Sequence, residues 1–405
     1  MVESMKKARI ARLAPRSIML LFSTVYFVSY LTRINYAAVI SVIIAEEGIQ
    51  ATLASVAVTG AFITYGIGQL LSGWLSDRVQ PAKLVAAALL ATSALNLAVP
   101  FCTPLLRNAV WSCNGMAQAF IWPPLIKMLP ALLEPAYQLR VSMRISWGGH
   151  LGNIAVYLIA PLCIGFWGFR SVFFLAAIAG FAMAAVWMFL CRGFAVDLER
   201  PHATAQKTDA PKRKAPAGVF LLVMLTIVLQ GSLRDGVTTW MPSYMSDTFA
   251  LGSALSVLTS VCMPIFALLC IWGVERLYYA VGNVQKCTCL LFAVALIASL
   301  CIPKAASVGV MPAILLFSLI VGPMHGINSL QTCMLPRQMG DAAHLGFYTG
   351  AFNGCVYIGS ALSTYVFAQV SETFGWNGTV LVWCVTAGLG ALLCLLLSLR
   401  RQETA

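Results

Sequence analysis

Residues 18–44 read IMLLFSTVYFVSYLTRINYAAVISVII, an apolar run of 27 residues whose single charge is Arg33. A helix needs about 20 mainly apolar residues to cross the hydrocarbon core of a bilayer. This run is long enough to cross, and it is too long for the apolar part of a cleaved signal sequence, so we expect it to be retained. It predicts a membrane-spanning helix that carries a charge near its middle.

The composition extends this prediction to the whole chain. Of 405 residues, 60% are hydrophobic and 10% are charged, and the mean hydropathy is +0.84. Soluble domains are about 45–50% apolar and about 25% charged. The composition therefore excludes a soluble enzyme, a secreted disulfide scaffold and a disordered chain. The 13 cysteines lie mostly in apolar runs, and we interpret them as small hydrophobic residues.

Further apolar stretches predict twelve spans in two groups of six. The first group covers residues 18–44, 52–75, 83–101, 105–133, 141–165 and 171–191, and the second covers residues 218–244, 253–274, 286–302, 308–335, 343–369 and 377–398. The longest polar stretch lies between the groups and predicts a cytoplasmic linker over residues 192–217. We expect an all-α membrane protein whose two halves are residues 1–191 and residues 218–405.

The basic residues predict the orientation of these spans. Of the 26 Lys and Arg residues, nineteen fall on the side of the N-terminus, three fall on the opposite side, and four lie within or at the ends of spans. Cytoplasmic loops carry an excess of Lys and Arg, so both termini are predicted to be cytoplasmic. The net charge of +12 is therefore explained by topology, and we expect no nucleic-acid partner.

The two predicted halves carry matching features in the same order. Arg33 lies fifteen residues after Ile18 in the first span, and Arg234 lies fifteen residues after Val219 in the seventh. Related halves are a common feature of transporters. The other matches are Asp77-Arg78 with Glu275-Arg276, Met128-Leu129-Pro130 with Met334-Leu335-Pro336, and Trp167 with Trp376.

The two intramembrane arginines predict an anion site. A charged side chain at the bilayer centre costs roughly 2.5–3.5 kcal/mol on insertion scales, so such residues are candidates for function. Two facing guanidiniums repel each other unless an anion lies between them, and a phosphate can be held bidentately by both. Asp235 is the only acid deep in a predicted span, so at most one arginine is neutralised by a carboxylate.

Polar residues at helical spacing add to this site. Five such stripes predict a polar central cavity, although hydrogen bonds between packed helices remain the alternative for any single stripe. His150 is either a ligand or a hydrogen-bonding group, and Lys127 either reaches the cavity or extends to the membrane surface. The stripes are Tyr26-Tyr30-Arg33, Tyr65-Gln69-Ser72, Ser146-His150-Asn153, His325-Asn328-Thr332 and Asn353-Tyr357-Ser360.

The chain resembles the major facilitator superfamily in its two sets of six helices, its basic linker and the motif GWLSDR at residues 73–78. In this motif Asp77 and Arg78 are expected to serve the inner gate. Within the superfamily the chain is most similar to the organophosphate:phosphate antiporters. That resemblance rests on YLTRINY at residues 30–36, Asn114-Gly115 through Gln118 to Trp122-Pro123-Pro124, LRDGV at residues 233–237 and FGW at residues 374–376.

The resemblance implies that Arg33 and Arg234 bind phosphate and that His150 belongs to the same site. Two departures make the site less positive: Gln69 replaces a lysine of the glycerol-phosphate carriers, and Asp235 follows Arg234 directly. The candidate substrate-binding residues are Arg33, Arg234, His150, Tyr30, Tyr26, Tyr65, Gln69, Lys127, Asp235 and Asn353.

These observations predict a monomeric transporter of the plasma membrane, the inner membrane of the cell, that exchanges an organic phosphate for inorganic phosphate. No enzymatic activity, metal or cofactor is expected, since the sequence lacks a nucleotide-binding glycine loop and zinc-site cysteine spacing. Two alternatives stay open. One is a proton-coupled carrier of another organic anion such as a hexuronate, with Asp235 or His150 as the titrating group. The other is a non-transporting sugar-phosphate sensor.

Overall fold

The computed structural model describes residues 9–76, 78–194, 217–335 and 345–402. The chain forms two compact units. The first unit comprises residues 1–39 and 60–203, and the second comprises residues 40–59 and 204–405. Residues 195–216 of the predicted linker lie outside the described residues, so the boundaries of the linker stay a prediction.

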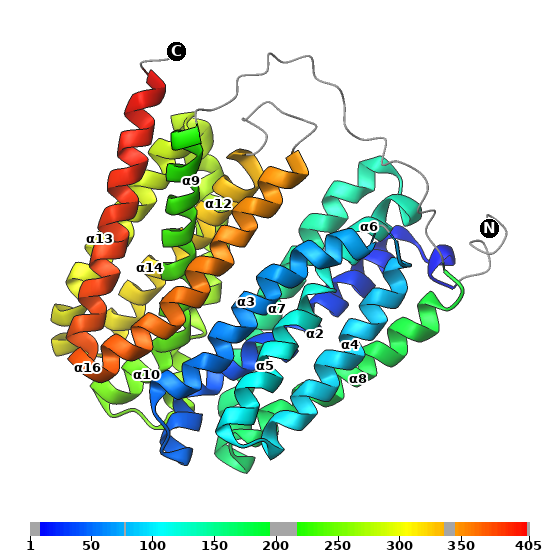
Figure 1. The fold of residues 1–405 in the computed structure, drawn as a ribbon, viewed down its shortest axis with the longest axis horizontal. Coiled ribbons are helices and arrows are strands. Elements are labelled where there is room, and N and C mark those ends of the chain that lie inside the picture. The colour runs from blue at the N-terminus through cyan, green and yellow to red at the C-terminus, as the bar shows by residue number, and fades with distance from the viewer. Residues whose placement is uncertain (1–8, 77, 195–216, 336–344, 403–405) are drawn as a thin grey trace. The chain divides into compact units, whose positions relative to one another are not determined.

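The first unit is built from long helices (Figure 1). Four of them begin at a proline, which suits the first helical position because its missing N–H has no partner there in any case. Helices α4 and α8 pack side by side. The helices, some of whose ends extend into the second unit, are α2 (Pro15–Glu47), α3 (Ala51–Ser76), α4 (Pro81–Ala98), α5 (Pro104–Ala119), α6 (Trp122–Leu132), α7 (Pro135–Trp167) and α8 (Arg170–Cys191), with short turns η1 (Ile10–Arg12) and η2 (Val99–Phe101).

The second unit contains two π-helical turns, η3 (Ser232–Gly236) and η4 (Leu330–Met334). Such turns are rare and occur frequently at functional sites. A third irregularity is Gly375, whose φ of 66° breaks the last long helix into two. The remaining helices are α9 (Ala217–Gly231), α10 (Val237–Phe249), α11 (Ser253–Thr259), α12 (Cys262–Val281), α13 (Val284–Val308), α14 (Val310–Ser329) and α16 (Leu345–Gln402).

Ten helices in the described ranges are long and apolar enough to cross a membrane. The fourth predicted span is not among them because it breaks between α5 and α6, ahead of Pro123 and Pro124. The break at Gly375 divides the segment Ala351–Leu399 into the last two predicted spans. With these two adjustments the helices correspond to the twelve predicted spans, and the all-α membrane fold is confirmed.

Glycines allow close backbone contact between the first and fifth spans of each half. A Cβ on Gly152 of α7 would lie 2.6 Å from the carbonyl oxygen of Phe27 on α2. In the second unit, a Cβ on Gly359 of α16 would lie 2.0 Å from the carbonyl oxygen of Val228 on α9. Neither distance is possible for a real side chain, so both helix pairs depend on glycine. The same device recurs in both halves, as expected for a duplicated unit.

Candidate functional site

Arg33 lies in the interior of α2 and packs against aromatic rings. Its guanidinium carbon is 3.8 Å from the ring centroid of Tyr65 on α3 and 5.7 Å from that of Tyr30, one turn earlier on α2. Tyr65 is 5% exposed. A cation over an aromatic face is attracted by the ring quadrupole, and the contact leaves the positive charge of the guanidinium in place. The structure thus brings Arg33 together with Tyr30, its neighbour in the first stripe, and with Tyr65 of the second stripe.

Tyr26 and Tyr30 continue this aromatic group toward α6 and α7. The two tyrosine rings meet edge to face at 5.3 Å, and Tyr26 also contacts Trp122 of α6 at 4.8 Å. A Cβ on Gly149 of α7 would come within 2.9 Å of both tyrosine rings. Gly149 therefore makes room for the rings of Tyr26 and Tyr30, which precede Arg33 on α2.

A buried hydrogen-bond network holds the backbone next to Arg33. The carbonyl oxygen of Thr32 accepts bonds from the side-chain amides of Asn96 (2.9 Å) and Asn114 (3.0 Å). Gln118 donates to the hydroxyl oxygens of Thr32 and Thr92, both at 2.7 Å, and Thr92 donates to Asn114 at 2.5 Å. These five residues are at most 3% exposed.

Because side chains of α4 and α5 bond the residue before Arg33, this network fixes the position of this part of α2 relative to those two helices. Sequence reasoning assigned Asn114 and Gln118 only to a family signature and missed Thr92 and Asn96. Their spacing of four residues within an apolar span was the available signal.

The other candidates of the first unit lie on α3, α6 and α7. Gln69 donates to the carbonyl oxygen of Ala119 at 3.3 Å, at the break between α5 and α6. Lys127 and His150 are half-buried on α6 and α7. Their roles stay predictions.

Arg234 lies in the π-helical turn η3 and forms an ion pair with its neighbour in sequence, Asp235. The Nε atom donates to Oδ1 at 2.7 Å and the Nη2 atom donates to Oδ2 at 2.6 Å. This bidentate geometry is the strongest form of the arginine–carboxylate pair. The side chains are 11% and 18% exposed, so the pair is largely shielded from solvent.

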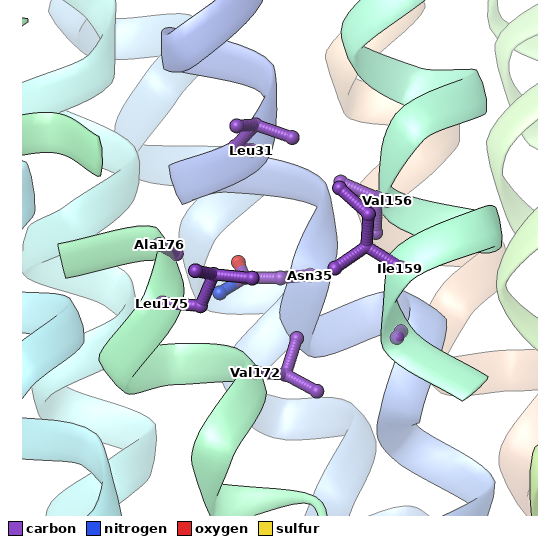
Figure 2. A pocket seen from close by; sticks show the side chains of 8 residues that line it. Leu31, Asn35, Val156, Ile159, Val172, Leu175 and Ala176 are labelled. Atoms are coloured by element: carbon purple, nitrogen blue, oxygen red, sulfur yellow. The ribbon is translucent and has the colours of Figure 1, made fainter. Parts of the chain in front are cut away.

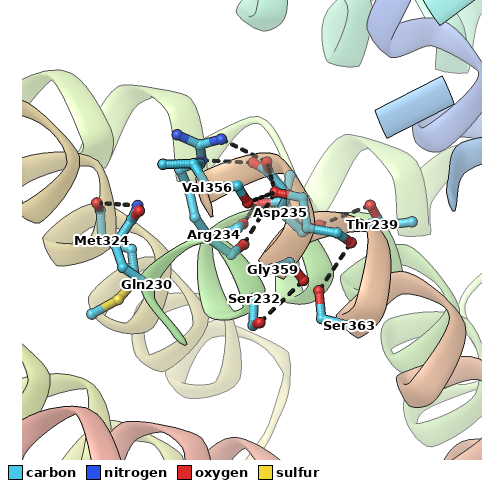
Figure 3. A network of polar contacts seen from close by, with 12 residues as sticks. Gln230, Ser232, Arg234, Asp235, Thr239, Met324, Val356, Gly359 and Ser363 are labelled. Carbon is cyan, nitrogen blue, oxygen red and sulfur yellow. Dashed lines mark hydrogen bonds and ion pairs between the residues drawn. The ribbon is translucent and has the colours of Figure 1, made fainter. Parts of the chain in front are cut away.

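Asp235 is itself held by α16. The hydroxyl of Ser360 donates to its Oδ2 atom at 2.5 Å, and Ser360 is fully buried. Figure 3 shows Arg234 and Asp235 within a wider set of contacts that link η3 to α16 and α9 to α14. In this set Ser232 donates to the carbonyl oxygen of Gly359 at 3.0 Å, and Gln230 of α9 donates to that of Met324 at 2.8 Å.

These contacts change one expectation from the sequence. We expected two guanidiniums that repel each other in an empty site, but the charge of Arg234 is already balanced by Asp235. His325 of α14 lies within electrostatic range of the same carboxylate. Asn353 of α16 is half-buried, and its role stays a prediction.

The gate residues are only partly visible. Arg78 stacks on Trp74, with its guanidinium carbon 4.1 Å from the ring centroid, and its Nη1 atom donates to the Trp74 carbonyl oxygen at 3.1 Å. Asp77 lies outside the described residues. The gating role of both residues stays a prediction.

The first unit also contains a pocket beside α2 (Figure 2). Asn35 is its one polar lining residue. An apolar lining does not suit an anion. The residues that line the pocket are Leu31, Asn35, Val156, Ile159, Ala160, Val172, Leu175 and Ala176.

Comparison with known proteins decides the family. The sequence profile of the Major Facilitator Superfamily matches residues 22–364. The chain belongs to this superfamily. The bacterial homologue of the human lysosomal transporter Spinster superposes on this member of the superfamily with a TM-score of 0.77, covering 95% of this chain and 97% of that structure. Its sequence identity is 11%, so the likeness concerns the fold.

The sequence relatives include sugar-phosphate proteins. Membrane sensor protein UhpC of Escherichia coli is 26% identical and covers 94% of this chain and 91% of its own length. The glycerol-3-phosphate transporter of Bacillus subtilis is 25% identical over 54% of each chain. A probable hexose phosphate transport protein of Chlamydia muridarum is 25% identical over 39% of this chain and 34% of its own. These names are consistent with the predicted resemblance to the organophosphate:phosphate antiporters.

Proposed function

We propose that this multi-pass membrane protein of the Major Facilitator Superfamily carries an organic phosphate anion across the inner membrane in exchange for inorganic phosphate. The observation that carries the proposal is that the two arginines lie at matching positions in the first span of each half. Arg33 lies 18 residues after the start of α2, and Arg234 lies 17 residues after the start of α9. Intramembrane charges mark substrate pathways, and arginine binds phosphate with well-defined geometry.

In the proposed mechanism the anion binds Arg33 and Arg234, one from each half, and the halves then rock around it. An anion bound by Arg33 and Arg234 offsets their mutual repulsion when the site closes to water. A loaded carrier therefore closes more readily than an empty one, and this difference yields exchange. Asp77 and Arg78 serve the gate on the cytoplasmic side, where both termini and the linker over residues 192–217 lie. The protein acts as a monomer.

The remaining candidates complete the proposed site. Tyr26, Tyr30 and Tyr65 line it with ring edges and hydroxyl groups, which bind the organic part of the ligand and hold Arg33 in place. Lys127 and His150 add positive charge or hydrogen-bond donors. Gln69 and Asn353 supply neutral polar groups.

The test is exchange in liposomes that contain purified protein and internal phosphate. We expect labelled phosphate to leave when external glycerol phosphate or hexose phosphate is added. Arg33→Ala and Arg234→Ala should each slow the exchange by about 100-fold or more, because each removes a charge-assisted bidentate contact. Arg170→Ala is the control, since Arg170 is an exposed arginine at the start of α8.

Exchange that is unchanged in both arginine variants would remove the proposed site. Uptake that requires an inward proton gradient and no internal phosphate would favour the proton-coupled carrier of another organic anion.

The second candidate is a sugar-phosphate sensor. It is favoured by the relatives named Membrane sensor protein UhpC, which match over about nine-tenths of both chains. A sensor binds a sugar phosphate through the same arginines but turns over poorly. Binding to purified protein without measurable exchange in liposomes would select this candidate.

A further inference from the structure

The short turn η1 packs against the last turns of α8 in the first unit (Figure 1). Ile10 of η1 is fully buried and belongs to the same hydrophobic cluster as Trp187 and Cys191 of α8. Arg9, the N-cap of η1, is exposed and places its guanidinium carbon 3.7 Å from the ring centroid of Phe189. The buried isoleucine therefore holds the neighbouring arginine over this ring.

The ring of Phe189 belongs to an exposed stripe along α8. Phe189 is 59% exposed although its side chain is large and apolar. Exposed residues recur every three or four positions before and after it, which is the spacing of one helical face. On a membrane-spanning helix, an exposed apolar face contacts the acyl chains of lipids. The stripe consists of Leu175, Ile178, Ala182, Val186, Phe189 and Arg192.

Arg192 brings a second positive charge to the end of this stripe. It is the C-cap of α8, it is exposed, and it lies three residues beyond Phe189. The described residues of the helices and turns in the hydrophobic cluster include three acids, and none of them belongs to η1 or α8. These acids are Glu46 and Glu47 in the last turn of α2, and Glu134 between α6 and α7.

The start of α4 lies beside the same end of α8, because the indole Nε1 atom of Trp187 donates to the carbonyl oxygen of Ala82 at 2.9 Å. The ionisable side chain that follows on α4, Lys83, is exposed and basic. The other ionisable residues at the start of the described chain, Arg12 and Arg16, are basic as well. Arg9 and Arg192 thus lie in a basic surrounding at one end of a lipid-facing helix.

We propose that this end of α8 binds an anionic phospholipid such as phosphatidylglycerol. The lipid phosphate lies between Arg9 and Arg192, and an acyl chain lies along Phe189 and the rest of the stripe. Guanidiniums hold phosphate oxygens by charge-assisted hydrogen bonds, and basic clusters at a membrane surface attract anionic lipids. The apolar stripe favours a ligand with acyl chains over a soluble phosphate. The proposal does not rest on the proposed function.

The test measures binding of short-chain phosphatidylglycerol and phosphatidylcholine to the purified full-length protein in a neutral detergent by native mass spectrometry. The two lipids can carry identical acyl chains, but only phosphatidylglycerol has a net negative charge. Wild type should bind phosphatidylglycerol about 20-fold more tightly or more, since each basic residue at a membrane surface contributes roughly a fivefold gain. The ratio is measured on one protein, so a change that weakens both lipids equally cancels.

Arg9→Ala and Arg192→Ala should each lower this preference by about fivefold, and the double variant should reduce it to a few-fold. Both side chains are exposed, so their removal leaves the hydrophobic cluster intact. Arg9→Lys/Arg192→Lys keeps both charges and should keep most of the preference. If the double lysine variant loses as much as the double alanine variant, charge is not what selects the lipid and the proposal fails.

The matched control is Arg276→Ala on α12 of the second unit. The guanidinium carbon of Arg276 lies 3.6 Å from the ring centroid of Trp272, which is 58% exposed. The cation, the distance and the exposure of the ring are thus nearly the same as for Arg9 and Phe189. The difference is an acid, Glu275, directly before the arginine. The control should keep the wild-type preference within about twofold.

A wild-type protein without a preference for phosphatidylglycerol would overturn the proposal. The same conclusion would follow if the double alanine variant kept the preference, or if Arg276→Ala lost as much as Arg9→Ala. Inorganic phosphate in millimolar excess should not displace phosphatidylglycerol from wild type. Displacement would show that the two arginines bind free phosphate rather than a lipid. A failure of phosphate exchange in liposomes would leave this proposal untouched.

Discussion

Arg33 and Arg234 occupy matching places in the two halves of the chain, but their surroundings differ in kind. Arg33 lies in a regular α-helix against aromatic rings, and the adjacent backbone is held by neutral amides and hydroxyls. Arg234 lies in a π-helical turn and is held by a carboxylate. A duplicated fold therefore does not imply duplicated surroundings: the arginine of one half packs against aromatic rings, and the arginine of the other half is paired with a carboxylate.

The largest expected difference between the halves is in stability. Arg234→Ala leaves the shielded carboxylate of Asp235 without its partner, and breaking such a pair costs about 3–5 kcal/mol of unfolding free energy. Arg33→Ala removes a cation–π contact and should cost about 1 kcal/mol. The double variant Arg234→Ala/Asp235→Ala should regain most of the loss. Denaturation of the purified proteins in detergent measures all three values, and equal losses for the two single variants would contradict the comparison.

A smaller effect is expected from the network beside Arg33. Thr92→Val removes the hydroxyl that bonds Asn114 and Gln118, and leaving buried polar groups unsatisfied costs about 1–3 kcal/mol. Because the network positions Arg33, we also expect the half-saturating concentration of phosphate in exchange to rise about tenfold. Thr92→Ser keeps the hydroxyl, so its half-saturating concentration should stay near the wild-type value.

The matched control for this network is Thr226→Val in the second unit, where Thr226 accepts a bond from Gln331 at 2.8 Å. It should cost similar stability but leave half-saturation near the wild-type value. If both threonine variants raise the half-saturating concentration equally, the network beside Arg33 has no special positioning role.

The smallest effect is expected at the ring under Arg33. Tyr65→Leu removes the cation–π contact, which contributes about 0.5–2 kcal/mol, and should weaken phosphate binding by a few-fold. Tyr65→Phe keeps the ring and should weaken phosphate binding less. Calorimetry with inorganic phosphate measures both. A larger loss in the phenylalanine variant would show that the tyrosine hydroxyl, rather than the ring face, is what matters.

The sequence predicts the membrane class, the twelve spans and the two arginines because each is a local property. Length and hydropathy mark a span, and a charge such as Arg33 or Arg234 in an apolar run is conspicuous whatever its neighbours do. Stripes such as Tyr26-Tyr30-Arg33 follow from helical periodicity alone, and the structure places Tyr65 of α3 on the same arginine. The roles of these residues in binding remain predictions that the experiments above test.

The sequence shows that Asp235 can offset the charge of Arg234, but the bidentate geometry of the pair was not predictable in the same way. Neighbouring residues on a regular α-helix point about 100° apart, so adjacency in sequence does not predict contact. The pair forms where the chain makes a π-helical turn and where Ser360, 125 residues away, anchors the carboxylate. Likewise, Thr92 and Asn96 acquire a role only because α2, α4 and α5 meet at Thr32.

By itself, the sequence determined that this protein is a bundle of membrane-spanning helices with one arginine deep in each half, since burial in lipid acts on each segment separately. Only the tertiary structure decided how each arginine's charge is matched. The partners of each arginine include side chains of helices that are far apart in the sequence. Contact between distant segments is a property of packing rather than of any one stretch of chain.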